Sequence, residues 1–103
     1  PLYSSAASDV YKRQEYVTVS DEQILEAMRT LGHTSGVFAE PAGATSIAGV
    51  MAWARQGRLR GDERIAALVT GSGLKDVAGA LKAVPAPPRI EPTLEAVRLH
   101  AGR

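Results

Sequence analysis

The sequence predicts an α/β domain, because short apolar runs alternate along the chain with segments of helical periodicity. The strand candidates are residues 16–19, 37–39 and 64–70, and each precedes a segment whose pattern is typical of a helix. The connections between them are long enough for crossovers that bring successive strands parallel. The third candidate contains a continuous apolar run, which favours a strand buried on both faces. We therefore expect a parallel sheet covered by helices.

The length of the chain limits how much of such a sheet it can form. The 103 residues have room for one small domain at most, and 45% apolar with 22% charged residues is a globular composition. Three short strands are too few for a comfortable doubly wound sheet. Residues 15–103 therefore fit the C-terminal part of a larger, three-layer parallel-sheet domain.

Charge and cysteine content exclude several classes of function. The formal net charge is +1, and the basic residues are scattered among acidic ones, so no nucleic-acid or membrane partner is indicated. The absence of cysteine excludes disulfides, thiolate catalysis and cysteine-ligated metals, and is compatible with a reducing compartment. Neither histidine has a second ligand one turn away, so no metal site is expected. With no signal-peptide pattern or membrane-span candidate, we expect a cytoplasmic protein.

Residues 1–14 do not continue the pattern of the rest. They show no sustained period of 2 or 3.6, and residues 5–14 resemble translated adapter sequence from assembled sequencing reads. We hypothesise that this tail is not native, and the alternative is an ordinary disordered terminus. An unbroken genomic reading frame through these residues would exclude the first explanation.

Helix boundaries are marked clearly in the first half of the chain. Ser20 and Gln23 form a capping box, so a helix begins there, and it is expected to fade between residues 32 and 36. Pro41 suits the first position of a second helix, which should run to about Gln56. The first half of that helix is almost entirely small residues, which predicts close approach of a neighbouring backbone or a ligand.

Two shorter helices are expected in the second half. Residues 74–84 form one candidate, stopped by the proline-rich segment 85–88. Thr93 can cap a final helix that carries Leu94, Val97 and Leu99.

Two polar loops follow strand candidates and are the best candidates for a site. Residues 40–46 (EPAGATS) follow the second strand, and residues 70–76 (TGSGLKD) follow the third. Open α/β sheets bind ligands at the carboxyl ends of their strands, so the two loops predict one wall of a small-molecule site.

Each of these loops also has a plainer interpretation. The glycines after Thr70 can simply form a tight turn, since the dinucleotide-binding fingerprint is incomplete and no P-loop occurs. Glu40 can complement a helix dipole rather than face a ligand. Lys75 is expected to be solvated, because nothing nearby in the sequence would desolvate its ammonium group.

Taken together, the EPAGA and LVTGSGLKD segments resemble the threonine synthase family of pyridoxal-phosphate enzymes, which have the tryptophan-synthase-β-like fold. The similarity extends from residue 15 to about residue 100 and corresponds to the C-terminal part of the family's chain. The Glu-Pro-Ala element is shared with threonine and serine dehydratases, whereas Thr-Gly-x-Gly-Leu-Lys-Asp points more narrowly to threonine synthases.

The resemblance implies roles for three residues. Thr70 matches the hydroxyl residue that hydrogen-bonds the pyridine nitrogen of pyridoxal 5′-phosphate, and Glu40 and Gly71 would lie near the same edge of the ring. A hydroxyl partner there leaves the nitrogen largely unprotonated and moderates the ring as an electron sink. The family's Schiff-base lysine is absent, since Lys12, Lys75 and Lys82 do not match it, and so is the phosphate-binding glycine loop.

The resemblance therefore implies an activity of the parent protein that this chain alone is expected to lack. The family converts O-phospho-L-homoserine and water to L-threonine and phosphate, and a homodimeric parent is implied. The alternatives are a relative of the same fold, such as a dehydratase or a cysteate-synthase-like enzyme, or a non-catalytic α/β module that binds a partner or metabolite.

Overall fold

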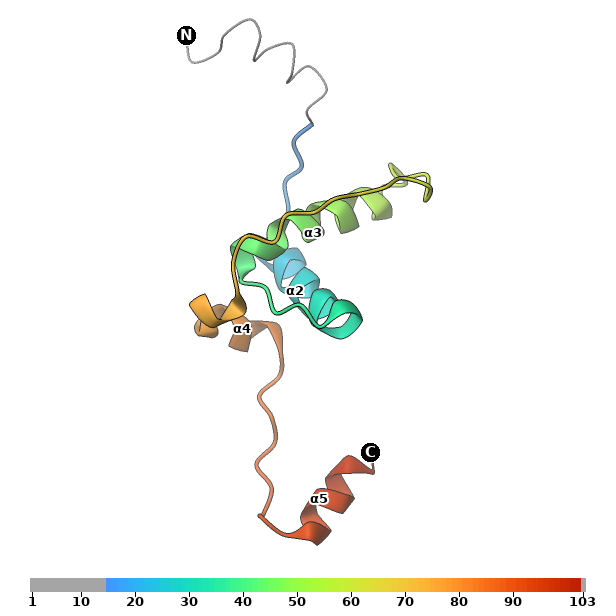
Figure 1. Cartoon of the computed structure of the whole chain (residues 1–103). Helices are drawn as coiled ribbons and strands as arrows, with labels where there is room; N and C mark the ends of the chain where they lie inside the picture. The colour runs from blue at the N-terminus through green and yellow to red at the C-terminus, as the bar shows by residue number, and fades with distance from the viewer. Residues whose placement is uncertain (1–14, 103) are drawn as a thin grey trace, which may run out of the picture.

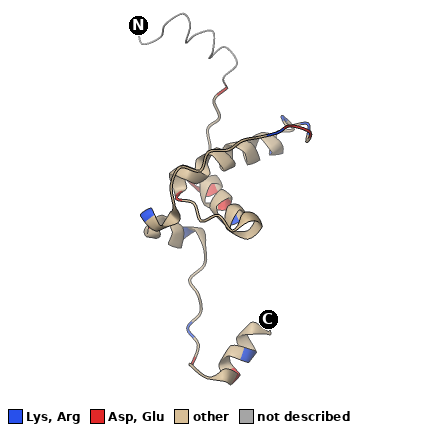
Figure 2. Cartoon of the chain, viewed as in Figure 1, with Lys and Arg blue, Asp and Glu red and all other residues tan. Residues whose placement is uncertain are grey.

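The computed structural model describes residues 15–102, so the predicted character of the 1–14 tail lies outside the described residues. Along the chain come α2 (Asp21–Ser35), α3 (Pro41–Arg55), a short 3₁₀ helix η1 (Gly73–Lys75), α4 (Val77–Ala83) and α5 (Leu94–Ala101) (Figure 1). Basic and acidic residues both occur on α2 and α5, whereas α3 carries a charged residue only at its last position, Arg55 (Figure 2). Within this part of the chain, no helix is long and apolar enough to cross a membrane.

The predicted ends of α2 are confirmed. The Ser20 hydroxyl accepts a hydrogen bond from the Gln23 amide, and the Gln23 side chain accepts one from the Ser20 amide at 2.8 Å. This reciprocal pair satisfies two amides that the first turn leaves without helical partners. At the other end, Gly36 takes a left-handed conformation with φ 70°, which glycine adopts without steric cost.

The predicted ends of α3 are also confirmed. Pro41 occupies the first turn, and the helix stops at Arg55, one residue before the expected Gln56. Gly57 follows with φ 67°, so the chain turns sharply there. The small side chains of α3 face inward, and its buried residues are Gly43, Ala44, Ala48, Gly49 and Ala52.

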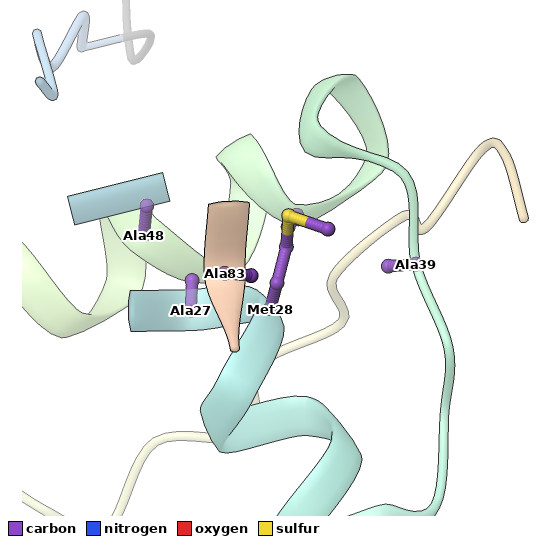
Figure 3. Packing of buried hydrophobic residues seen from close by; sticks show 6 residues of the cluster. Ala27, Met28, Ala39, Ala48 and Ala83 are labelled. Atoms are coloured by element: carbon purple, nitrogen blue, oxygen red, sulfur yellow. The ribbon is translucent and has the colours of Figure 1, made fainter. Parts of the chain in front are cut away.

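The core lies where α2 crosses α3 and meets α4. It is built from small side chains: among residues 15–102, every buried apolar residue apart from Met28 is an alanine. Figure 3 shows the Met28 side chain of α2 reaching between the neighbouring segments, with Ala48 of α3 and Ala83 of α4 close by. The Arg29 guanidinium donates to the Ala83 carbonyl at 2.8 Å and thereby fastens the end of α4 to α2. Such a core permits close backbone approach but buries little apolar surface.

The three predicted strands are extended segments rather than strands in this structure. No strand occurs among residues 15–102, and the sole β-bridge recorded there pairs Ala39 with Ser72 in antiparallel orientation. A strand needs a neighbouring backbone about 4.8 Å away with which to exchange hydrogen bonds. Segment 64–70 runs beside α3 instead (Figure 1). The parallel sheet expected from the sequence is thus not formed within the described part of the chain.

The third helix begins later than the sequence suggested. Residues 73–75 form the 3₁₀ turn η1, and α4 starts only at Val77. The Asp76 carboxylate accepts a hydrogen bond from the Gly79 amide at 2.8 Å, which makes Asp76 the N-cap of α4. The helix assigned to 74–84 is therefore corrected to Val77–Ala83, because Asp76 starts a new helix.

The final helix forms as predicted, but within residues 15–102 it stands apart from the other helices (Figure 1). The Thr93 hydroxyl accepts from the Ala96 amide at 3.1 Å, which confirms the expected cap. None of the residues of α5 is buried, and an extended proline-rich segment separates it from α4 (Figure 1). The radius of gyration is 19.0 Å, against about 13 Å for a packed domain of ~100 residues.

Candidate functional site

The two polar loops singled out in the sequence lie against each other. The Glu40 amide donates to the Gly71 carbonyl at 2.9 Å, and the Gly73 amide donates to the Phe38 carbonyl at 2.9 Å. These bonds flank the Ala39–Ser72 bridge. The end of segment 37–39 and the start of η1 are therefore joined backbone to backbone, although more than thirty residues separate them in sequence.

Glu40 packs its side chain directly over Gly71. A Cβ built on Gly71 would overlap the Glu40 carboxylate, so a larger residue at this position would force the Glu40 side chain to move. The Glu40 side chain is 15% exposed, and its Oε1 lies 3.3 Å from the Lys75 Nζ. Glu40 is the N-cap residue of α3, yet its side chain makes no capping hydrogen bond. The carboxylate thus contacts the second loop rather than capping its own helix.

The small residues of α3 hold the segment that carries Thr70. A Cβ on Gly43 would lie 3.2 Å from the Gly71 backbone and 3.3 Å from the Thr70 nitrogen, so even a methyl group would press on this backbone. The Ser46 hydroxyl donates to the Leu68 carbonyl at 2.9 Å, two residues before Thr70. The close backbone approach predicted for the small-residue half of α3 is therefore confirmed.

Thr70 itself is exposed at the edge of this contact. Its backbone neighbours on both sides are held by α3, while within residues 15–102 no hydrogen bond of its hydroxyl is recorded. A threonine hydroxyl can donate one hydrogen bond and accept two, so Thr70 presents free bonding capacity from a fixed position. The chemistry available here is orientation of a polar ligand atom.

The structure brings together all three residues selected from the sequence: Thr70, Gly71 and Glu40. Sequence reasoning missed the partner of Glu40, because Lys75 is 35 positions away and its side chain is 67% exposed. It also missed Ser46 as a contact of the Thr70 segment. No local pattern signals either pairing, since both depend on how α3 lies against segment 68–71.

A second concave region lies on the other side of Phe38. An apolar hollow of ≈400 Å³ opens between α2 and α4, lined by residues that include Met28, Phe38, Ala80 and Leu81. Its polar lining groups include Arg29, already bound to the Ala83 carbonyl, and His33 in the last turn of α2. This hollow lacks the convergent polar groups of the Glu40–Gly71 contact.

Comparison with known proteins decides the family. The family described as "Pyridoxal-phosphate dependent enzyme" matches residues 3–71, about two thirds of the chain. The chain belongs to this family of pyridoxal-phosphate-dependent enzymes. The resemblance noted in the sequence is thereby confirmed at the family level, and with it the tryptophan-synthase-β-like fold class. The match includes the first loop, Thr70 and Gly71.

The chain is also similar to individual curated proteins, and those named here are threonine synthases. The threonine synthase of Methanocaldococcus jannaschii is 41% identical over 93 residues, which cover 88% of this chain and 23% of the relative. The threonine synthase of Bacillus sp. strain ULM1 is 50% identical over 58 residues, or 56% of this chain and 16% of the relative. That of Mycobacterium bovis is 37% identical over 82 residues, or 80% and 23%. The chain spans about a fifth of the length of these relatives.

Proposed function

We propose that this chain is the C-terminal part of a threonine synthase and contributes the pyridine-side wall of its cofactor pocket. The parent protein would convert O-phospho-L-homoserine and water to L-threonine and phosphate, as a cytoplasmic homodimer acting on a small-molecule substrate. The names of the curated relatives and the TGSGLKD loop support this assignment. No nucleic-acid or membrane partner is part of the proposal.

The observation that carries the proposal is the exposed Thr70 on an anchored backbone. Ser46 and Gly43 contact the backbone on either side of it, so the residue that carries the hydroxyl is positioned before any ligand arrives. The cofactor, when bound, supplies the electron sink for chemistry at the substrate's carbon atoms. Thr70 would hydrogen-bond the pyridine nitrogen and, being neutral, leave it without a proton. Glu40 and Gly71 would shape the pocket beside that edge.

The donor set fits one edge of the cofactor only. Lys75 is engaged with Glu40, Lys82 lies in the last turn of α4, and Lys12 lies outside the described residues. The resemblance assigns the cofactor-linking role to none of them. We therefore expect that the isolated chain neither attaches the cofactor covalently nor forms threonine.

The missing sheet fits the same proposal. Segment 64–70 leaves apolar side chains open to solvent, with Ile65 50% and Leu68 78% exposed. Extended apolar segments of this kind are covered when strands pair on both sides and helices pack on the faces. We propose that segments 16–19, 37–39 and 64–70 become strands of a parallel sheet completed by other parts of the parent protein.

Replacement of Thr70 in the complete reading frame that encodes this chain tests the proposal. Thr70→Val keeps the shape and removes the hydroxyl, and we expect kcat to fall about tenfold or more, as for loss of one oriented hydrogen bond. The absorption maximum of the bound cofactor should shift in the same variant. Thr70→Ser is the matched control and should retain both properties. Unchanged kcat and spectrum in Thr70→Val would refute the assignment of Thr70.

The alternative enzymes of the same fold would share the pyridine-side wall of the cofactor pocket and differ in the substrate they use. A dehydratase would release ammonia from threonine or serine, whereas the proposed enzyme would release phosphate from O-phospho-L-homoserine. Assaying the complete protein for the two products separates these activities.

A further inference from the structure

The structure contains an ion pair across the two loops whose purpose neither helix formation nor capping explains. The Glu40 carboxylate, 15% exposed, lies over Gly71 and within 3.3 Å of the Lys75 ammonium. Serine, threonine, aspartate and asparagine are the preferred N-cap residues, and glutamate is not among them. Glu40 stands at that position without capping α3. Its side chain therefore serves a contact outside its own helix.

The backbone that carries Lys75 is anchored, which fixes where its side chain starts. Its amide donates to the Ser72 carbonyl at 3.0 Å, and the Ser72 hydroxyl caps the same turn through the Leu74 amide at 3.3 Å. The Gly73 amide then ties the turn to the Phe38 carbonyl. A Cβ on Gly73 would overlap the Phe38 ring, so the turn lies tightly against segment 37–39. The lysine thus extends from a backbone that is bonded on two sides.

We propose that the Glu40–Lys75 pair is a positioning latch. Lys75 holds the Glu40 carboxylate over Gly71, and the carboxylate in turn keeps Gly71, and Thr70 beside it, at a fixed distance from α3. Lys75 and Glu40 are thus positioning residues that act on the pocket wall through Gly71. The consequence for catalysis rests on the proposed function, whereas the latch itself concerns only the geometry of this chain.

The burial of Glu40 distinguishes this pair from ordinary surface pairs. Arg60 and Asp62 also form an ion pair, but their side chains are 79% and 75% exposed, and such pairs contribute little. Removing Lys75 would leave the Glu40 carboxylate largely shielded from water and without its cation, a costly state that the side chain escapes by turning outward. Gly71 would then lose the group that packs on it.

Amide hydrogen exchange tests the latch directly, measured without cofactor in the protein encoded by the complete reading frame that contains this chain. In Lys75→Met we expect the Glu40 and Gly73 amides, which bond the two loops together, to exchange about fivefold faster. Lys75→Arg keeps the charge and should stay within about twofold of the unsubstituted protein. Lys82→Met on α4 and Arg60→Ala are matched controls and should leave both amides unchanged. Equal exchange in Lys75→Met and the unsubstituted protein would overturn the proposal.

Kinetics separates a positioning role from general loss of structure. Lys75→Met should lower kcat by about fivefold with KM nearly unchanged, and Lys75→Arg should restore it. A charge-reversed pair, Glu40→Lys with Lys75→Glu, should recover part of the exchange protection that either single change removes. Faster exchange in Lys75→Met, together with unchanged kcat and cofactor spectrum in Thr70→Val, would uphold the latch and refute the proposed role of Thr70. The opposite pair of results would uphold the function and refute the latch.

Discussion

The α2–α3 pair and α5 begin with equally good helix signals, yet only the pair buries side chains. Ser20 caps α2 and Thr93 caps α5, each through a hydroxyl that accepts a main-chain amide hydrogen bond. Ala27 and Met28 of α2 are buried, whereas Leu94 and Leu99 of α5 remain 67% and 73% exposed. Capping and periodicity therefore decide that a helix forms, and a complementary neighbour decides whether it is packed.

The neighbour that α2 has and α5 lacks is a helix of small residues. The alanines and glycines of α3 let α2 and segment 68–71 approach its backbone, which brings the two loops of the site together. No such surface faces α5 within residues 15–102. An isolated helix of 8 residues is marginal in water. We infer that α5 is stabilised by contacts that other parts of the parent protein provide.

The largest difference between the two regions should appear when a single alanine is replaced by leucine, once in α3 and once in α5. Ala48→Leu forces a larger side chain between α3 and α2, where Ala48 is 1% exposed, and should cost about 1–3 kcal/mol through overpacking. Ala101→Leu on the exposed α5 should change stability by less than about 0.5 kcal/mol. Helix content of this chain expressed on its own, measured by circular dichroism during urea unfolding, distinguishes the two variants. Similar losses from both variants would show that α5 is packed in solution.

Removing the N-cap side chains of α2 and α5 should lower stability by a smaller amount and should affect different numbers of helices. Ser20→Ala should cost about 1 kcal/mol and speed amide exchange in both α2 and α3, because the two helices share a core. Thr93→Ala should unfold α5 alone and leave exchange in α2 and α3 unchanged. Peptide-resolved exchange measures both. Coupled loosening of α3 in Thr93→Ala would contradict the independence of α5.

The smallest effect concerns the exposed turn after α3. The Glu63 carboxylate accepts hydrogen bonds from the Arg60 amide at 2.8 Å and the Gly61 amide at 2.9 Å. These backbone donors, Arg60 first, lower the pKa of Glu63 below its ordinary value of 4.5. The ionised Glu63 carboxylate therefore stabilises the folded turn above about pH 4.5, and this stabilisation is lost as the pH falls through the lowered pKa of the folded state. Amide shifts of Arg60 and Gly61 followed by NMR from pH 6 to 3 should report this change, and Glu63→Gln should abolish it.

Much of the local structure could be predicted because its causes are local. The capping box at Ser20, Pro41 at the start of α3 and the Thr93 cap each involve groups within four residues of one another. Asp76 is a further local signal, and it explains the late start of α4. Its carboxylate accepts a hydrogen bond from the Gly79 amide three residues later, so α4 begins at Val77, just after η1 ends at Lys75. The small residues of α3 also announced a close backbone neighbour, but not which one.

The sequence by itself determined α2, α3 and α5 with their ends, the family resemblance and the choice of Thr70, Gly71 and Glu40. Only the tertiary structure decided that Glu40 lies over Gly71, that Lys75 is its partner and that Ser46 holds Leu68. It also decided that segment 64–70 lies beside α3 rather than beside a strand. The physical reason is range: caps and helical periodicity act within a few residues, whereas ion pairs and backbone pairing depend on segments that only the packed chain brings together.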